Sequence, residues 1–268
     1  MAKKIKKNKK SSDITINRER ILSSLKKVYL GGAIGECLLV VKKGVATCEV
    51  VDITNSIVVL EKGRIGSKSL SGQFGLGNIE VMIKFLASVP DDKLIVATED
   101  TGRMIITGKN KRRSLDYLTT LPNLIATRLR MDSSDKTDYV KEFQKMTDIA
   151  VTVPSDFIKD FNSYLSVLKS KIVTFDINDE RCMVTLGAST EHQFQLRIPE
   201  EYIENDDEEE IIVQTNGENL SRVFSVMETN DDESPTMSIG EDNPIVVEDG
   251  STMWALTPFK DDSAGEDD

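Results

Sequence analysis

Few residues of this sequence combine the side-chain types and the spacing that catalysis or metal binding requires. The three cysteines, Cys37, Cys48 and Cys182, lie far apart, and His192 is the only histidine. No CxxC pair or histidine pair is therefore present to form a zinc site, and three separated cysteines do not make a disulfide framework. A Walker-type loop and a nucleophile motif are also missing. The sequence therefore predicts a protein that is not an enzyme and that needs no cofactor.

Two short segments have the composition of ligand loops but not the required pattern. Residues 72–77 are rich in glycine, yet they lack the GxGxxG order of a dinucleotide loop, so we interpret them as a turn into a helix. Residues 176–180 are acidic, but the glycine and the twelfth-position glutamate of a calcium loop are missing. A tight turn between two strands fits residues 176–180 better.

Charge is distributed unevenly along the chain. The 268 residues carry 45 acidic and 34 basic side chains, a net charge of −11, which by itself argues against a nucleic-acid binder. Six lysines nevertheless fall in the first ten residues, while residues 206–210 and 261–268 are acidic. The basic start is followed by no apolar segment of the kind found in a signal peptide or a membrane span. With its unpaired cysteines, the chain is expected to be soluble and cytoplasmic.

Apolar periodicity predicts two helices and several strands in the first half. One helix follows Asn17 and ends at Gly31, and a second begins at Asn78 and ends before Pro90. Strand-like alternation covers residues 37–41, 45–52 and 56–60 between the helices, and residues 94–98, 103–107 and 114–118 after them.

The second half repeats this plan. A helix begins at Pro154-Ser155 with the apolar phase of the first helix, strands are expected at 172–177, 182–186 and 193–198, and a further helix follows Asn219. Matching elements are offset by roughly 136 to 142 residues. We interpret this as an internal duplication: an α+β fold with two domains, 13–128 and 148–260, each with two helices packed on antiparallel sheets. Residues 1–12 and 261–268 are expected to be a disordered basic tail and an acidic tail, and 129–147 a connector.

The polar face of each predicted helix carries a base. In an acidic chain, a basic side chain on every helix favours a surface that contacts nucleic-acid phosphates without recognising the nucleobase sequence. Lysines on a single solvated face would be ordinary. The candidate DNA-binding residues are Arg20, Lys26, Lys27, Lys84, Lys159, Lys169 and Arg222.

Several short tracts resemble the DNA sliding clamp family. Residues 74–86 and 91–96 resemble the first domain of the sliding clamps of T-even-type phages. Residues 237–249 and 253–258 resemble the last strands of proliferating cell nuclear antigen, and Val51-Asp52 resembles a turn in its first domain. The likeness covers most of residues 17–260.

The resemblance implies a homotrimeric ring that encircles duplex DNA, with helices lining the hole. The implied partners are double-stranded DNA, a DNA polymerase and an ATP-dependent clamp loader, in the cytoplasm of a phage-infected bacterial cell. Because an unpaired strand edge promotes aggregation, strand 114–118 of one subunit is expected to pair with residues 193–198 of the next. The expected interface residues are Ser114, Leu115, Tyr117, Gln193, Phe194, Gln195 and Leu196.

The family also binds partner peptides near the interdomain connector. The resemblance places that pocket at Val51, Ile57, Val140, Phe143, Pro244, Trp254, Ala255 and Pro258. A core position for Trp254 is an equally good interpretation. Two other functions stay open: a monomeric processivity factor of the same fold that holds DNA by charge, and a phage structural or assembly protein.

Overall fold

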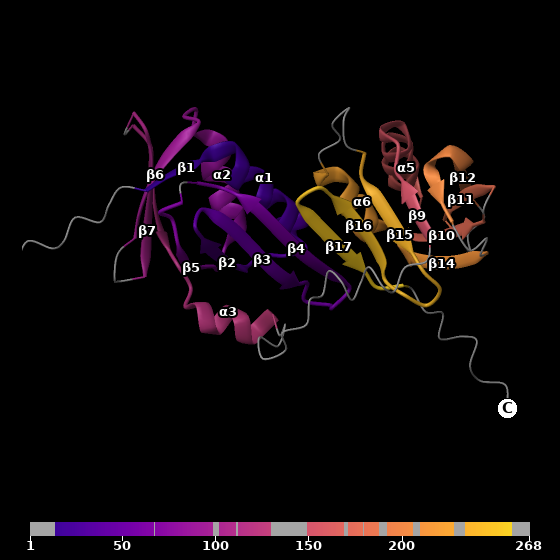
Figure 1. The fold of residues 1–268 in the computed structure, drawn as a ribbon, viewed down its shortest axis with the longest axis horizontal. Helices are drawn as coiled ribbons and strands as arrows, with labels where there is room; N and C mark the ends of the chain where they lie inside the picture. Colours follow the sequence, from indigo (N-terminus) through magenta and orange to yellow (C-terminus); the bar gives the residue numbers. More distant parts are fainter. Residues whose placement is uncertain are drawn as a thin grey trace, which may run out of the picture.

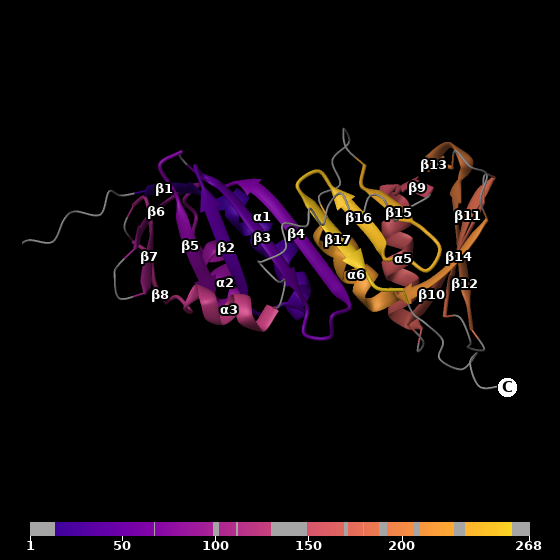
Figure 2. The ribbon, with the colours of Figure 1, turned by 60° about the horizontal axis from the view of Figure 1, so that its bottom comes forward.

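Figure 1 shows the computed structural model of the 268-residue chain. The structure describes residues 14–66, 68–98, 102–110, 112–129, 149–168, 171–178, 180–187, 192–205, 210–227 and 234–258. Within these residues the chain forms two units placed side by side along the long axis of the molecule (Figures 1 and 2).

The first unit runs from β1 to β8. Its elements are β1 (Ile14–Asn17), α1 (Arg18–Tyr29), η1 (Leu30–Gly32), β2 (Cys37–Lys42), β3 (Val45–Val51), β4 (Ile57–Arg64), β5 (Gly72–Leu76), α2 (Ile79–Ser88), β6 (Lys93–Thr98), β7 (Arg103–Gly108) and β8 (Ser114–Leu118). A further helix, α3 (Pro122–Leu129), follows β8. Sequence periodicity missed α3, and it interpreted residues 72–77 as a turn where the structure has strand β5.

The second unit repeats this order. Its elements are β9 (Ile149–Thr152), α5 (Ser155–Val167), β10 (Ile172–Ile177), β11 (Arg181–Leu186), β12 (Phe194–Pro199), η2 (Glu200–Tyr202), β13 (Ile203–Glu204), β14 (Ile211–Asn216), α6 (Gly217–Val226), β15 (Thr236–Ile239), β16 (Ile245–Asp249) and β17 (Thr252–Leu256). Apart from η2 and β13, every element from β9 to β17 has a counterpart between β1 and β8. The predicted duplication is confirmed, and so is the turn between β10 and β11. The last helix, however, is capped by Asn216 and not by Asn219.

Three antiparallel sheets carry the two units. One sheet has the order β1-β6-β7-β8 and another has the order β12-β11-β10-β14. The third sheet crosses both units, in the order β13-β9-β15-β16-β17-β4-β3-β2-β5. Its centre is the pair β17–β4, in which Trp254 lies opposite Val59 and Thr252 opposite Glu61. Main-chain hydrogen bonds therefore join the first unit to the second.

The helices form a layer on one face of this central sheet. α1 packs beside α2 in the first unit, and α5 packs beside α6 in the second. α1 also contacts α6 across the seam, which is the boundary between the two units at the strand pair β17–β4. Asparagine side chains fix three of the helix starts, because Asn17, Asn78 and Asn216 each accept a hydrogen bond from a backbone N–H of the first turn. The apolar stripe of each helix is buried against the sheets.

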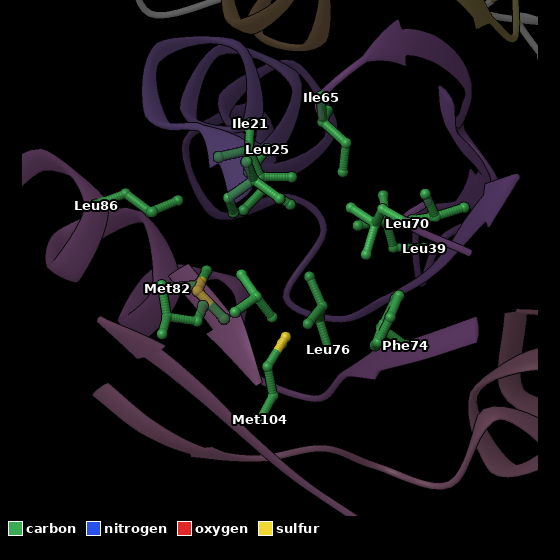
Figure 3. Close-up of a pocket in the computed structure, with 14 residues that line it drawn as sticks. Ile21, Leu25, Leu39, Ile65, Leu70, Phe74, Leu76, Met82, Leu86 and Met104 are labelled. Atoms are coloured by element: carbon green, nitrogen blue, oxygen red, sulfur yellow. The ribbon is translucent and has the colours of Figure 1, made fainter. Parts of the chain in front are cut away.

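One continuous hydrophobic core runs through both units, but its two halves are filled differently. In the second unit Phe157, Phe161 and Phe224 meet edge to face or tilted, with centroids of Phe161 and Phe224 5.1 Å apart. The core of the first unit is built mostly from aliphatic side chains and methionines, and these line a small internal pocket (Figure 3). Leu25 and Met82 from the helices face Leu39 and Leu76 from the sheet there. The pocket has no polar lining residue, so we assign it to the core and not to a functional site.

α3 lies on the opposite face of the central sheet from α1 and α2, against β2 and β5. Gly75 makes this approach possible. A Cβ at Gly75 would lie 2.1 Å from the carbonyl oxygen of Thr120 and 3.0 Å from Ile125, whose side chain is fully buried. The absence of a side chain at Gly75 thus lets the segment after β8 pack directly against the backbone of β5. Among the described residues, no helix is long and apolar enough to cross a membrane.

Candidate nucleic-acid interface

The layer of four helices carries most of the predicted DNA-binding bases at its surface. Arg20 and Lys26 on α1, Lys84 on α2 and Lys159 on α5 are exposed, and Arg222 on α6 is partly exposed. Because these helices lie on one face of the sheet, their bases belong to one side of the molecule. Lys169 lies outside the described residues.

Acidic side chains on the same helices balance these bases. Lys84 Nζ lies 2.5 Å from Glu80, and Arg222 Nη2 lies 3.0 Å from Glu218, in each case one turn earlier in the helix. The carboxylate of Glu80 raises the pKa of Lys84 above its ordinary value. The sequence pattern did not anticipate that acids of the first helical turns would pair with these basic residues. Lys26 and Lys159 form no ion pair with any described residue.

Lys27 does not belong to this surface, and its assignment as an exposed DNA-binding residue is wrong. Its side chain is buried, and Nζ lies 2.6 Å from Oδ1 of Asp249, which is buried as well. The backbone carbonyl of Lys27 also accepts a hydrogen bond of 3.1 Å from Nε1 of Trp254. Helical geometry placed Lys27 on the polar side of α1, but at Lys27 the helix packs against β16 and β17 of the second unit.

A second buried contact lies beside this ion pair. Ser24 of α1 donates to Oε1 of Glu61 at 2.7 Å, and the hydroxyl of Thr252 donates to the other oxygen of the same carboxylate. Glu61 is on β4 of the first unit and Thr252 on β17 of the second. Both buried carboxylates at the seam are therefore hydrogen-bonded, as burial of a charge requires.

The two strands predicted to form a subunit interface are sheet edges. β8 ends one four-stranded sheet and β12 ends the other, and within the described residues neither has a second neighbour. They lie at opposite ends of the elongated molecule (Figure 2). On β8, Tyr117 faces inward and bonds to the backbone of Asn78, while Ser114 is exposed and Leu115 is half-buried. At β12, Phe194 and Leu196 are half-buried, and Gln193 and Gln195 are exposed.

The seam inside the chain shows how these edges can pair. β8 is the counterpart of β17, and β12 is the counterpart of β4. Inward-facing residues fix the correspondence: Leu115 lies opposite Ile106 on β7, just as Trp254 lies opposite Val247 on β16. Phe194 lies opposite the last inward residue of β11, as Val59 does on β3. Since Trp254 pairs with Val59, the same geometry would place Leu115 of one copy opposite Phe194 of another, and Ser114 opposite Gln195.

The residues predicted for a peptide pocket do not all reach the surface. Trp254 is completely buried, so its interpretation as a core aromatic holds and its place in a pocket is corrected. Ile57 and Ala255 are also buried, whereas Val51, Pro244 and Pro258 are partly exposed. Val140 and Phe143 lie outside the described residues.

A groove of about 590 Å³ nevertheless lies beside part of this set. Its walls come from the turn after β3, from α6 and its N-cap, from residues 32–33 after α1, and from the two residues that follow β17. They include Asp52, Ile53, Ser56, Asn216, Asn219, Arg222, Thr257 and Pro258. Ile53 is 94% exposed, and the turn that presents it is held by Asp52. The sequence pattern assigned Pro258 to a peptide pocket and Arg222 to DNA binding, but it did not find Asn216 and Asn219. These residues come together only in the folded chain.

Asp52 organises that turn through its carboxylate. Oδ1 accepts from the backbone N–H groups of Ser56 at 2.6 Å and Ile57 at 2.7 Å, and Oδ2 accepts from Thr54. Burial by itself raises the pKa of Asp52, but these hydrogen bonds outweigh burial and hold the pKa below its ordinary value. Asp52 is therefore a structural carboxylate that shapes the loop.

Comparisons with known proteins bear on the fold. No protein-family model matches the chain, and no curated protein matches it. A solved structure described as the C-terminal region of FEN-1 bound to A. fulgidus PCNA is similar, with a TM-score of 0.71, 12% identity, and coverage of 93% of this chain and 98% of that chain. PCNA from Thermococcus kodakaraensis is similar with a TM-score of 0.71 and 10% identity, over 92% of this chain and 99% of that chain. The chain has the sliding-clamp fold.

The clamp fold is also shared with a protein of a second kind. A putative DNA polymerase III beta subunit from Eubacterium rectale is similar with a TM-score of 0.69 and 10% identity, over 97% of this chain and 68% of that longer chain. The clamp fold explains why the duplicated units and the continuous helix layer occur together. Among the described residues, no group of three or more histidine, cysteine or acidic side chains could hold a metal ion.

Proposed function

We propose that this chain is a DNA sliding clamp, a non-enzymatic processivity factor that encircles duplex DNA and tethers a DNA polymerase to it. The observation that carries the proposal is the pair of open edges, β8 and β12. They are the counterparts of the two strands that already pair inside the chain, β17 and β4. Copies joined head to tail by the same geometry use each edge once, and such an interface forms a ring if the rotation closes.

Ring closure assigns a role to the helix layer. The helices of each copy would face the hole, where Lys26, Lys159 and Arg20 would meet phosphates without reading sequence. A helix layer of nearly balanced charge would hold DNA weakly. Weak contacts are sufficient for a closed ring, because a closed ring cannot leave the DNA sideways and weak contacts let it slide.

The ring is proposed to contain three copies, as the resemblance to sliding clamps implies. Further proposed partners are the polymerase, an ATP-dependent clamp loader and, on the same resemblance, a phage replication system in an infected bacterial cell. The groove beside Asp52 and Pro258 supports a docking position for partner peptides near the seam. The resemblance to sliding clamps also assigns Val140 and Phe143 to this docking position, and both lie outside the described residues.

Solution mass tests the assembly directly. Light scattering behind size exclusion should give 89.4 kDa, three times the 29.8 kDa of one chain. A stable mass of 29.8 kDa at micromolar concentration would contradict the ring and favour a monomeric factor of the same fold that holds DNA by charge.

A cross-link tests how the copies are joined. The proposed pairing of β8 of one copy with β12 of the next is called the joint. The double variant Ser114→Cys/Gln195→Cys should form disulfide-linked oligomers under mild oxidation, because these positions are expected to lie opposite one another across the joint. The matched control is Leu60→Cys/Met253→Cys, which lie opposite one another in the seam and should cross-link within one chain. Intramolecular links in the control without intermolecular links in the first variant would reject the proposed joint.

A further inference from the structure

One carboxylate oxygen at the β8 end of the molecule is buried and has no hydrogen-bond partner in the described part of the chain. Oδ2 of Asp91 is inaccessible to solvent, and no described residue donates a hydrogen bond to it. A buried carboxylate oxygen without a donor is costly. Asp91 as a whole is only half-buried, so a donor from another copy that reached its carboxylate would be stabilising.

Asp91 lies at a defined place in the duplicated architecture. Its Oδ2 is 2.5 Å from where a Cβ on Gly108 would stand. Gly108 ends β7, two residues beyond Ile106, and Asp249 ends β16, two residues beyond Val247. Gly108 and Asp249 are therefore counterparts. The carboxylate of Asp91 occupies, in the first unit, approximately the place that the carboxylate of Asp249 occupies in the second.

Inside the chain, Asp249 receives its donor from Lys27 on the neighbouring unit. Lys27 is the tenth residue after Asn17, the N-cap of α1, and Tyr164 is the tenth residue after Pro154, the N-cap of α5. Both N-caps follow equivalent strands, β1 and β9, so Tyr164 is the counterpart of Lys27. The open edge at β12 thus presents a tyrosine where the seam presents a lysine.

The ring of Tyr164 is fixed by stacking, while its hydroxyl can still donate a hydrogen bond. Its aromatic ring is half-buried and stacks on Phe194 of β12, with centroids 4.6 Å apart and an interplanar angle of 10°. Within the described residues the hydroxyl forms no hydrogen bond. The stack fixes the side chain beside the open edge, so binding costs little further side-chain entropy.

We propose that, across the joint between two copies, the hydroxyl of Tyr164 of one copy donates a hydrogen bond to the carboxylate of Asp91 of the next. The inference rests on the proposed ring and identifies a residue pair that the ring uses. At the joint, Tyr164 and Asp91 would take the positions that Lys27 and Asp249 have at the seam. The stacked Tyr164 and Phe194 would meanwhile cover Leu115, which takes the place of Trp254 at the joint.

The test is a double-mutant cycle on assembly of the full-length chain. Tyr164→Phe keeps the aromatic stack and removes only the hydroxyl, and Asp91→Asn removes the charge from the acceptor. Sedimentation equilibrium should show that Tyr164→Phe raises the dissociation constant of the joint roughly tenfold, the effect of removing a hydrogen bond to a charged group. In the Asp91→Asn background, the same substitution should have a much smaller effect.

The matched control is Tyr202→Phe, which removes a hydroxyl from another half-buried tyrosine of the second unit and should leave assembly unchanged. Equal effects of Tyr164→Phe in both backgrounds, or none in either, would reject the contact. The Ser114→Cys/Gln195→Cys cross-link separates this failure from failure of the ring. Intermolecular cross-links without coupling overturn only the Tyr164–Asp91 contact, whereas a chain that neither assembles nor cross-links overturns the ring and the contact together.

Discussion

Lys27 and Asp249, 222 residues apart in sequence, form a buried ion pair that joins α1 of the first unit to the end of β16 in the second. Next to it, Glu61 bonds to Ser24 and Thr252. Such contacts contribute little net stability compared with an apolar replacement, because both charges lose water. Their geometry is demanding, however, so we infer that they fix the angle between the two units, on which the curvature of any ring would depend.

Removal of one partner of this pair should destabilise the chain strongly. Lys27→Met leaves the carboxylate of Asp249 buried without its cation, which costs about 3–5 kcal/mol in unfolding free energy. Urea denaturation followed by circular dichroism measures the change. Lys26→Met, on the exposed side of the same helix, is the control and should change stability by less than about 0.5 kcal/mol. Equal effects of the two substitutions would show that the ion pair is not buried in solution.

Gly75 should tolerate no side chain. Gly75→Ala would place a methyl group 2.1 Å from the carbonyl oxygen of Thr120, so either β5 or the segment after β8 must move. Overpacking of this kind costs about 1–3 kcal/mol. Gly35→Ala is the matched control, because nothing lies within 4 Å of the added methyl group and the backbone there is not left-handed. Thermal unfolding should separate the two variants, and identical midpoints would contradict the seating of this segment on Gly75.

Sequence patterns predicted the fold well because its elements are amphipathic and repeated. The bounds expected for residues 114–118 and 172–177 are those of β8 and β10, since buried and exposed residues alternate there. β5 was missed because Gly72 and Gly75 lack side chains and so give no alternation. α3 was missed because it is short, begins at Pro122 and is separated from β8 by only three residues.

The surface was harder to predict because it depends on contacts between units. An exposed and a buried position on α1 look alike in sequence, and only packing against β16 and β17 distinguishes Lys27 from Lys26. The pairing of Glu80 with Lys84 was accessible from their four-residue spacing, which is a standard helical ion-pair signal. Asp91 and Tyr164 carried no such signal, because their significance depends on superposing the two units.

Asp52 should make stability depend on acid pH. Its pKa is lowered in the folded chain, so its contribution is fully present above the unfolded value of about 3.9 and is lost as the pH falls through the folded pKa. At pH 7, Asp52→Asn should therefore be less stable than wild type by about 1–3 kcal/mol. The difference should shrink below pH 4, as measured by urea denaturation at several pH values. A difference that stays constant down to pH 2 would contradict this account.

The three cysteines should resist alkylation in the folded chain. Cys37, Cys48 and Cys182 are buried. Burial is the main cause that raises the pKa of Cys182 to about 12, and a hydrogen bond with Cys37 followed by burial raises that of Cys48. Because the thiolate is the reactive form, iodoacetamide at pH 8 should label none of them until denaturant is added. Mass spectrometry counts the labels, and rapid labelling without denaturant would show that a core opens under native conditions.

DNA binding should depend mainly on those basic residues of the helix layer that form no ion pair with a described residue, and less on those that do. Lys26→Ala or Lys159→Ala should lower the salt dependence of binding by about 0.9 in slope for each phosphate that the lysine neutralises, measured by fluorescence anisotropy with a short blunt duplex. Lys84 is already paired, so Glu80→Gln should release it and raise the slope. Lys62→Ala is the control: Lys62 is exposed on β4 and points away from the helices, since its neighbour Glu61 faces α1. If the control lowers the slope as much as Lys26→Ala does, DNA is not held by the helix layer.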